Sequence, residues 1–233
     1  MAEQEIALIV GSGPGLSASL ARLFKKNGMK VALAARDIKK LDPLVKEIEG
    51  CAYPCDASSP SDVKRLFQSV RQNFGDPNLV VYNASGRVRG PIGELDPEDV
   101  RQSILITCYG GFLIGQEAAK GMLKAGRGTI LFTGASASVK GYANSPAFAM
   151  GKMGLTGLVQ SMARELQPHN IHVAQVVIDG GISDPARPER LAARGPDGCL
   201  DPDAIAQTYL QLHRQHRSAW ASHIELRPWS EKF

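Results

Sequence analysis

A strand-like stretch that runs directly into a glycine-rich turn dominates the start of the chain. Residues 6–10, IALIV, are apolar throughout, and GSGPG follows at 11–15, before an amphipathic segment at 16–27. A strand that is apolar at every position is buried on both faces, as the strands of a parallel sheet are. Glycines permit a tight turn from such a strand into a helix, whose first N–H groups then lie open to an anion. The stretch therefore predicts a parallel α/β sheet with a phosphate-sized site at its first turn.

Strand-like and helix-like segments alternate along the rest of the chain. We expect strands at 31–35, 79–82, 129–133 and 171–178, a candidate edge strand at 224–226, and helices at 41–49, 62–74, 97–124, 147–167 and 204–215. This alternation is typical of a single-domain α/β protein with a Rossmann-type, doubly wound parallel sheet, here over residues 1–233. Residues 183–202 are rich in proline, glycine and arginine and predict a loop or lid, because only a short segment follows them.

Composition and charge argue against several classes of function. The 233 residues carry a formal net charge of +4 without any block of like charge, which indicates a solvated surface and no nucleic-acid partner. The four cysteines have neither the spacing of a zinc site nor that of a disulfide framework, so we expect reduced thiols and no metal. No stretch is apolar over the thickness of a bilayer, and no targeting sequence is recognisable. We therefore expect a cytoplasmic protein without membrane contact.

The glycine-rich turn has the composition of a diphosphate site. Its candidate contact residues are Gly11, Ser12, Gly13, Gly15 and Leu16. Between a strand and a helix, such residues bring the backbone close to a dinucleotide and set the helix N-terminus against its diphosphate. A tight turn without any ligand is the alternative, because glycine clusters serve both purposes.

The end of the second predicted strand bears on the choice of cofactor. NAD sites place an acidic residue there to bind the ribose hydroxyl groups. Here the chain reads Ala34-Ala35-Arg36-Asp37, and the guanidinium of Arg36 is suited to a 2′-phosphate. We therefore predict NADP(H) in preference to NAD(H). The alternative is that Arg36 is a surface residue paired with Asp37.

Five short elements follow one another over nearly the whole chain. They are Gly11-x-x-x-Gly15-Leu16, Pro54-Cys55-Asp56, Asn83-Ala84-Ser85-Gly86, Lys152 four residues after an aromatic, and Asp179-Gly180-Gly181-Ile182. In type and order they resemble those of the short-chain dehydrogenase/reductase family, with Ser17 at the family's last glycine. The resemblance implies cofactor contacts at the adenine from Asp56 and Ala57, along the cofactor from Asn83, Ala84 and Ser85, and at the nicotinamide amide from Ile182.

The catalytic positions depart from the family pattern. The resemblance implies a tyrosine proton donor, a lysine that lowers the tyrosine pKa and holds the nicotinamide ribose, a serine that orients the carbonyl and an asparagine that holds a water. Phe148 stands at the tyrosine position, Ala135 at the serine and Thr107 at the asparagine, so that only Lys152 matches. Phenylalanine has no proton to give, and a general acid or base contributes about 10²–10⁴-fold to a rate. We therefore expect the usual hydride-transfer route to be severely impaired.

Other groups are candidates for the missing proton donor. Thr107 itself, Ser136 just beyond the serine position, Tyr142 in the following loop, or a water can supply protons. Tyr142 is the preferred replacement, because its loop borders the substrate cleft of the family that the chain resembles. Its alternative role is that of a loop aromatic packed on its neighbours.

These observations support two functional hypotheses. The first is an NADP(H)-binding oxidoreductase that acts on a small molecule through a non-standard or impaired proton-transfer site, with Lys152 orienting the cofactor. The alternative is a catalytically inactive NADP(H)-binding module, a sensor or an oligomer partner. The resemblance also implies a homodimer or homotetramer, whose interface the apolar residues Phe112, Leu113, Leu155 and Leu158 would suit.

Overall fold

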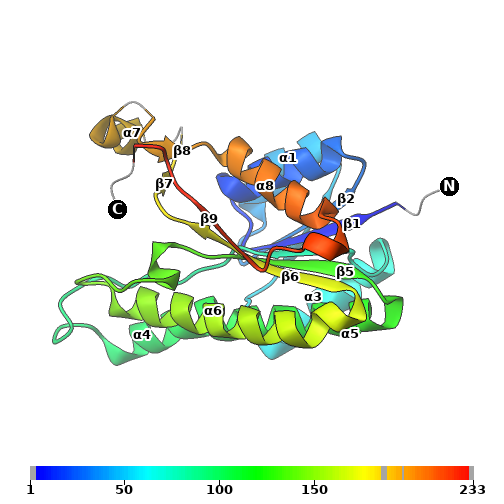
Figure 1. Cartoon of the computed structure of the whole chain (residues 1–233), viewed down its shortest axis with the longest axis horizontal. Helices are drawn as coiled ribbons and strands as arrows, with labels where there is room; N and C mark the ends of the chain where they lie inside the picture. The colour runs from blue at the N-terminus through cyan, green and yellow to red at the C-terminus, as the bar shows by residue number, and fades with distance from the viewer. Residues whose placement is uncertain (1–3, 185–187, 196, 231–233) are drawn as a thin grey trace.

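A parallel sheet of seven strands, in the order β3-β2-β1-β4-β5-β6-β9, forms the centre of the protein (Figure 1). The structure is a computed structural model that describes residues 4–184, 188–195 and 197–230. The strands are β1 (Ile6–Val10), β2 (Lys30–Ala35), β3 (Cys51–Pro54), β4 (Leu79–Tyr82), β5 (Gly128–Thr133), β6 (Ile171–Ile178) and β9 (His223–Leu226). The strand order reverses between β1 and β4, and ligands of such sheets bind at the carboxyl ends of the strands beside the reversal. The predicted fold class is confirmed, with β3 as a strand that the sequence pattern did not reveal.

Helices cover both faces of this sheet (Figure 1). On one face lie α1 (Leu16–Lys26), α2 (Asp42–Ile48) and α8 (Pro202–Arg214), and on the other α3 (Pro60–Asn73), α4 (Pro97–Ile104), α5 (Gly110–Ala125) and α6 (Pro146–Leu166). Each strand contributes to both layers because successive side chains point to opposite faces. In β1, for example, Leu8 packs towards α3 and α5, whereas Ile9 packs towards α1.

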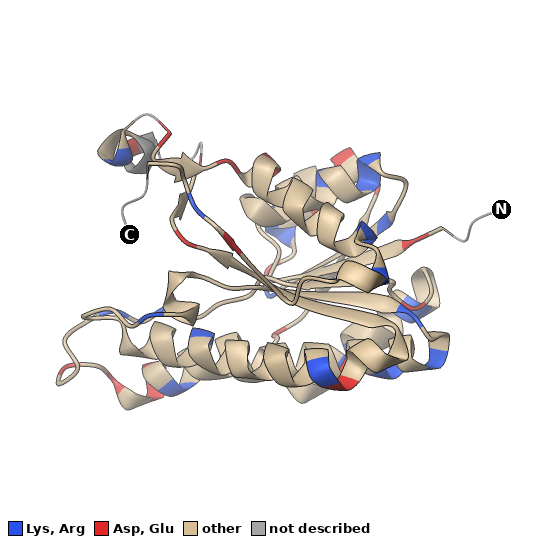
Figure 2. Ribbon diagram, in the orientation of Figure 1, with Lys and Arg blue, Asp and Glu red and all other residues tan. Residues whose placement is uncertain are grey.

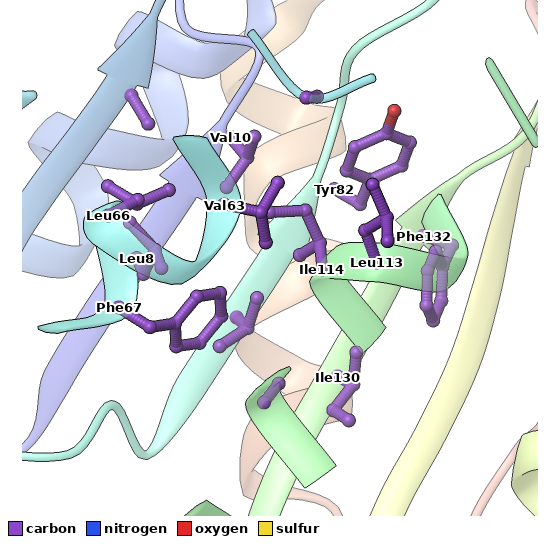
Figure 3. Close-up of a cluster of buried hydrophobic side chains, with 14 of the residues drawn as sticks. Leu8, Val10, Val63, Leu66, Phe67, Tyr82, Leu113, Ile114, Ile130 and Phe132 are labelled. Carbon is purple, nitrogen blue, oxygen red and sulfur yellow. The ribbon is translucent and has the colours of Figure 1, made fainter. Parts of the chain in front are cut away.

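The larger apolar cluster lies between the sheet and the helices α3, α5 and α6. Figure 3 shows Phe67 of α3, Ile114 of α5 and Phe132 of β5 converging there. Two residues predicted for a subunit interface, Leu113 and Leu155, belong to this cluster and are buried. That part of the interface prediction is wrong, because these side chains already face the sheet of their own chain.

Side chains cap the N-termini of α3, α4 and α8, whereas α1 has no such cap. Ser59 accepts a hydrogen bond from the N–H of Asp62 at α3, and Asp96 and Asp201 cap α4 and α8 in the same way. The residue before α1 is Gly15, which has no side chain to offer. The first N–H groups of α1 are therefore not occupied by a capping side chain.

The long helical region predicted at 97–124 is interrupted by a π-helical turn at Leu105–Tyr109. The hydroxyl of Tyr82 donates a hydrogen bond to the carbonyl of Ile106 within this turn. Gly110 follows, and a Cβ there would lie 2.5 Å from the Tyr82 hydroxyl oxygen. The predicted helical region is confirmed, and the π-turn beside Tyr82 of β4 is a local departure from the α-helical pattern inside it.

The segment predicted as a loop or lid contains regular structure. Strand β7 (Gly181–Ile182) pairs with β8 (Cys199–Leu200), and α7 (Pro188–Arg194) lies between them. In Figure 1 these elements stand beyond the carboxyl ends of the large strands. The expectation of an irregular loop is therefore wrong for the described part of 183–202, and its action as a lid stays a prediction.

Charged residues of both signs are dispersed over the helices and loops around the sheet (Figure 2). The four cysteines are free thiols. Within the described residues, no helix is long and apolar enough to cross a membrane, and no three metal-ligating side chains lie together. The cytoplasmic location stays a prediction.

Candidate functional site

The glycine-rich turn after β1 leaves open space over part of its backbone. The N–H groups of Gly11 and Ser12 both donate to the carbonyl of Ala34, each at 3.0 Å, which fixes the turn beside the end of β2. A Cβ at Gly13 or Gly15 would meet nothing within 4 Å, so the space over both glycines is open. The N-terminus of α1 begins at this open space, and the arrangement suits a bound anion such as a diphosphate.

The side chain of Ser17 stabilises the same turn by two hydrogen bonds. Its hydroxyl donates to the carbonyl of Gly11 at 3.2 Å and accepts from Nδ2 of Asn83 at 2.8 Å. The N–H of Asn83 in turn donates to the carbonyl of Val10 at 2.8 Å. Ser17 is buried, so this serine, which is predicted to stand at the family's last glycine, stabilises the turn from the core side. The space over Gly13 and Gly15 therefore stays open.

Gly11 is the glycine of this turn that cannot be replaced without strain. Its φ is +84°, and a Cβ would lie 2.5 Å from Cα of Ala84. We expect Gly11→Ala to lower the free energy of unfolding by about 2–4 kcal/mol. Thermal denaturation of the variant beside Gly13→Ala tests this, since Gly13 has open space and an ordinary φ. Equal melting temperatures for the two variants would contradict the assignment of Gly11 to a structural role.

The residues predicted at the adenosine end differ in what they offer. Arg36 is exposed, and Asp37 pairs with Lys40 at 3.3 Å, so the alternative pairing of Asp37 with Arg36 is wrong. Asp56 accepts hydrogen bonds from the N–H of Ser58 at 2.9 Å and from its hydroxyl at 2.7 Å. The side chain of Ala57 is buried in the core, which leaves its backbone as the group that a ligand can contact.

Lys152 of α6 is the buried cation of the site. It is 3% exposed, and its Nζ donates to the carbonyl of Thr133 at 2.7 Å. Burial, and after it the positive charge of Arg87, lowers the pKa of Lys152 to about 7. The neutral amine of Lys152 is therefore far more accessible near neutral pH than that of an exposed lysine.

The positions predicted for the family's serine and tyrosine are apolar and lie together. Ala135 and Phe148 pack with Ala137 in a small cluster of their own. The Nζ of Lys152 is 6.0 Å from the centroid of the Phe148 ring, on whose face the guanidinium of Arg87 lies at 4.2 Å. The cluster contains no hydroxyl group, because all three of its members are hydrocarbon side chains.

The three predicted substitutes for the proton donor lie in different settings. Thr107 is fully buried in the π-turn, and its Oγ1 accepts from the N–H of Gly86 at 2.8 Å. Ser136 is half-buried at the start of the short helical turn Ser136–Ser138. Tyr142 is 45% exposed and lies with its ring 5.8 Å from Nζ of Lys140. Contact between Tyr142 and Lys152 therefore stays a prediction.

Three further hydroxyl groups, those of Ser138, Tyr209 and Tyr82, already take part in hydrogen bonds within the chain. Ser138, which the sequence reasoning did not consider, accepts from the N–H of Ala135 at 3.1 Å, and it is buried beside Gln175. The hydroxyl of Tyr209 in α8 lies 2.8 Å from Oγ1 of Thr133, on the opposite face of the sheet from α6. Burial raises the pKa of Tyr209 and of Tyr82, so neither phenol is suited to proton transfer.

The end of β6 carries the last predicted cofactor contact. Asp179, where the family has proline, lies 3.1 Å from Nη2 of Arg227 and 3.8 Å from Nζ of Lys140. Ile182 in β7 is half-buried and packs against the cluster under α8. The carboxylate of Asp179 is thus paired with Arg227 and Lys140 of the same chain. Contact of Ile182 with the nicotinamide stays a prediction.

A depression of about 530 Å³ lies at the amino ends of the strands, at the other end of the sheet from the candidate site. Both ring nitrogens of His172 lie within 3.0 Å of backbone carbonyls, and His213 bridges Thr129 and Glu5. These polar groups hold the C-terminal segment in place. The depression is remote from Lys152 and is not part of the candidate site.

Comparison with known proteins assigns the family. A family model described as short chain dehydrogenase matches residues 5–190, and the chain belongs to this family. It is 31% identical over 175 residues to (21S)-21-acetoxyl-apo-melianone synthase SDR of Melia azedarach. That match covers 73% of this chain and 65% of the relative, so the chain spans less than two thirds of the relative's length.

Two solved structures are similar over almost the whole chain. The short-chain dehydrogenase from Rhodopseudomonas palustris is 34% identical with a TM-score of 0.84, over 97% of this chain and 99% of that one. A metagenomic short-chain oxidoreductase in complex with NADP is 26% identical, also with a TM-score of 0.84, over 97% of this chain and 98% of that one.

Proposed function

We propose that the protein is an NADP(H)-dependent oxidoreductase whose proton transfer does not use the serine and tyrosine of its family. The observation that carries the proposal is the open space over Gly13 and Gly15 at the N-terminus of α1, which no side chain caps, with exposed Arg36 at the neighbouring strand end. A guanidinium at that place suits a 2′-phosphate, whereas a carboxylate would repel it. The metagenomic relative, which was solved with NADP, supports the same choice of cofactor.

The residues present fit such a cofactor from end to end. The open space over Gly13 and Gly15 would take the diphosphate, Arg36 the 2′-phosphate, and Lys152 the hydroxyl groups of the nicotinamide ribose. NADP(H) supplies or accepts the hydride when it is bound. The chain's own residues orient the reactants and must provide the accompanying proton.

Lys152 has a protonation state that suits both of these tasks. Because its pKa is lowered to about 7, it can hold a ribose hydroxyl as a donor and can also exchange a proton near neutral pH. Thr107, Ser136, Tyr142 or a water remain the proposed carriers between Lys152 and the substrate. A reaction that needs little acid assistance, such as reduction of an activated double bond or an imine, fits this arrangement better than reduction of a simple ketone.

The alternative function is that of an NADP(H)-binding module without hydride chemistry. The apolar cluster of Ala135, Ala137 and Phe148 favours it, because that cluster offers no group that can donate a proton to a carbonyl. Turnover with any carbonyl, imine or activated alkene would exclude this alternative.

We further propose that the protein associates with itself as a homodimer or homotetramer. Tyr109 and Phe112 stack with ring centroids 6.0 Å apart and remain partly exposed, as do Met150 and Met153 of α6. Exposed apolar side chains on adjacent helices are typical of subunit interfaces. Phe112 thus keeps its predicted role, and Leu158 is half-buried at the margin of the core.

The cofactor choice is tested by titrating the purified protein with NADPH and with NADH while following nicotinamide fluorescence. We expect Arg36→Ala to weaken NADPH binding by about 10- to 100-fold and to leave NADH binding nearly unchanged, because a charge-assisted contact with the 2′-phosphate is lost. Lys46→Ala removes an exposed charge from α2 and serves as the control. Failure of the wild type to bind either nucleotide would overturn the proposed function.

A further inference from the structure

The hydroxyl group of Ser17 links two segments of the candidate site that are far apart in the sequence. It donates to the carbonyl of Gly11 at 3.2 Å, in the turn after β1, and accepts from Nδ2 of Asn83 at 2.8 Å, directly after β4. A hydroxyl group both donates and accepts, so the two bonds are compatible. Ser17 is 2% exposed, and water therefore competes little for either bond. One side chain thus connects the ends of two neighbouring strands.

Two backbone contacts hold the same turn against the same loop. The N–H of Asn83 donates to the carbonyl of Val10 at 2.8 Å. A Cβ at Gly11 would lie 2.5 Å from Cα of Ala84, so the two backbones are in direct contact there. The turn and the start of the loop after β4 therefore form one packed unit, and Ser17 supplies its side-chain link.

The geometry of this unit bears on the proposed diphosphate site. The open space over Gly13 and Gly15 belongs to the same turn, and α1 begins directly after it. Hydrogen bonds from backbone N–H groups to a phosphate weaken steeply when their distance or direction changes. Without the hydroxyl group of Ser17, the carbonyl of Gly11 loses a donor and the amide of Asn83 loses an acceptor. The turn would then be free to shift against the loop, and its N–H groups would shift with it.

We propose that Ser17 is a positioning residue for the cofactor, whose hydroxyl group sets the diphosphate turn against the loop after β4 through Asn83. Glycine, the residue that the family pattern places at this position, has no hydroxyl group and cannot form the link. Ser17 acts from the core side, so its effect reaches the diphosphate through the backbone of the turn. This inference rests on the proposed NADP(H) function, since it concerns the same site. It implies that Ser17 matters to ligands that reach the turn and not to those that reach Arg36 alone.

The test compares two ligands across four variants. NADPH binding is followed by nicotinamide fluorescence. Binding of adenosine 2′-phosphate, which carries the phosphate proposed for Arg36 but no diphosphate, is followed by calorimetry. The variants are Ser17→Ala, Asn83→Ala, the double variant that combines them, and Ser19→Ala as the control. Ser19 is a buried serine two residues further along α1. Thermal denaturation shows that each unliganded variant is folded.

We expect Ser17→Ala to weaken NADPH binding by about 5- to 50-fold, the range of two hydrogen bonds of ordinary strength. Its affinity for adenosine 2′-phosphate should equal that of the wild type, and Ser19→Ala should leave both affinities unchanged. In the double variant the two substitutions should act together less than additively, because either one alone already breaks the link between Ser17 and Asn83. This comparison of single and double variants decides independently of the second ligand.

Three results would overturn the role of Ser17 while leaving the proposed function intact. They are an unchanged affinity of Ser17→Ala for NADPH, an equal loss of affinity for both ligands, which would indicate a general distortion, and effects of Ser17→Ala and Asn83→Ala on NADPH binding that simply add. Absence of NADPH binding in the wild type would instead overturn both proposals.

Discussion

Placing a hydroxyl group at each of the two positions predicted for the family's tyrosine and serine, with Phe148→Tyr and Ala135→Ser in one variant, is expected to raise the rate of NADPH-dependent carbonyl reduction by about 10²–10⁴-fold. Nζ of Lys152 already lies 6.0 Å from the ring centroid, so the new phenol would stand beside a cation that favours its ionised form. The serine would add a donor to the carbonyl oxygen. Initial rates with a panel of aldehydes and ketones measure the effect.

The controls separate a lost proton donor from a displaced one. Ala143→Ser adds a hydroxyl in the exposed loop before α6 and should change nothing. Tyr142→Phe should leave the double variant active, because that variant carries its own phenol. A wild type that already matches the double variant would contradict the idea of an impaired site, and its inactivation by Tyr142→Phe would identify Tyr142 as the donor.

Lys152→Met is expected to make the unliganded protein more stable and at the same time to weaken its binding of NADPH. Burial of an ammonium group is costly, as the lowered pKa of Lys152 shows, and methionine fills a similar volume without charge. The carbonyl of Thr133 loses its donor, which offsets part of the gain. We expect a net gain of about 1–3 kcal/mol, or about 5 °C in melting temperature at pH 7. The loss of a ribose contact should weaken NADPH binding by about 10- to 100-fold.

The stability gain should depend on pH with a definite sign. The pKa of Lys152 is lowered to about 7 in the folded protein from the ordinary value of 10.5, so between these pH values the unfolded chain binds more protons. Stability of the wild type therefore rises with pH across this window, and the advantage of Lys152→Met is largest at pH 7 and below. Lys124→Met, at an exposed position of α5, should show neither effect. A lower melting temperature for Lys152→Met at pH 7 would contradict the argument.

The arrangement of strands and helices was predictable because it depends on local patterns. Strand β1 is buried on both faces and reads as a continuous apolar run, and the glycines after it require a tight turn. Strand β3 was missed because it is short, lies at the edge of the sheet and ends in Pro54. A strand with few buried residues leaves little apolar pattern to detect.

Other features depend on segments that meet only in the folded chain. The support of Gly11 by Ser17 and Asn83 joins the ends of two strands, and the contact of Arg87 with Phe148 joins the loop after β4 to the first turn of α6. Residue spacing contains no signal for such contacts. The glycine-rich turn, Arg36 and Lys152 could be singled out as candidates because each residue type already suggests its chemistry, and their contacts with a cofactor stay predictions.

The π-turn at Leu105–Tyr109 has a geometric consequence for the two helices that it joins. A π-turn is equivalent to one extra residue in an α-helix, and each residue advances an α-helix by about 100°. The side chains of α4 and α5 are therefore out of phase with those of an uninterrupted helix. The face of α5 that carries the exposed Phe112 therefore does not continue the face by which α4 contacts α6. A single-residue change in the length of this turn would rotate one helix about its axis with almost no effect on the path of the chain.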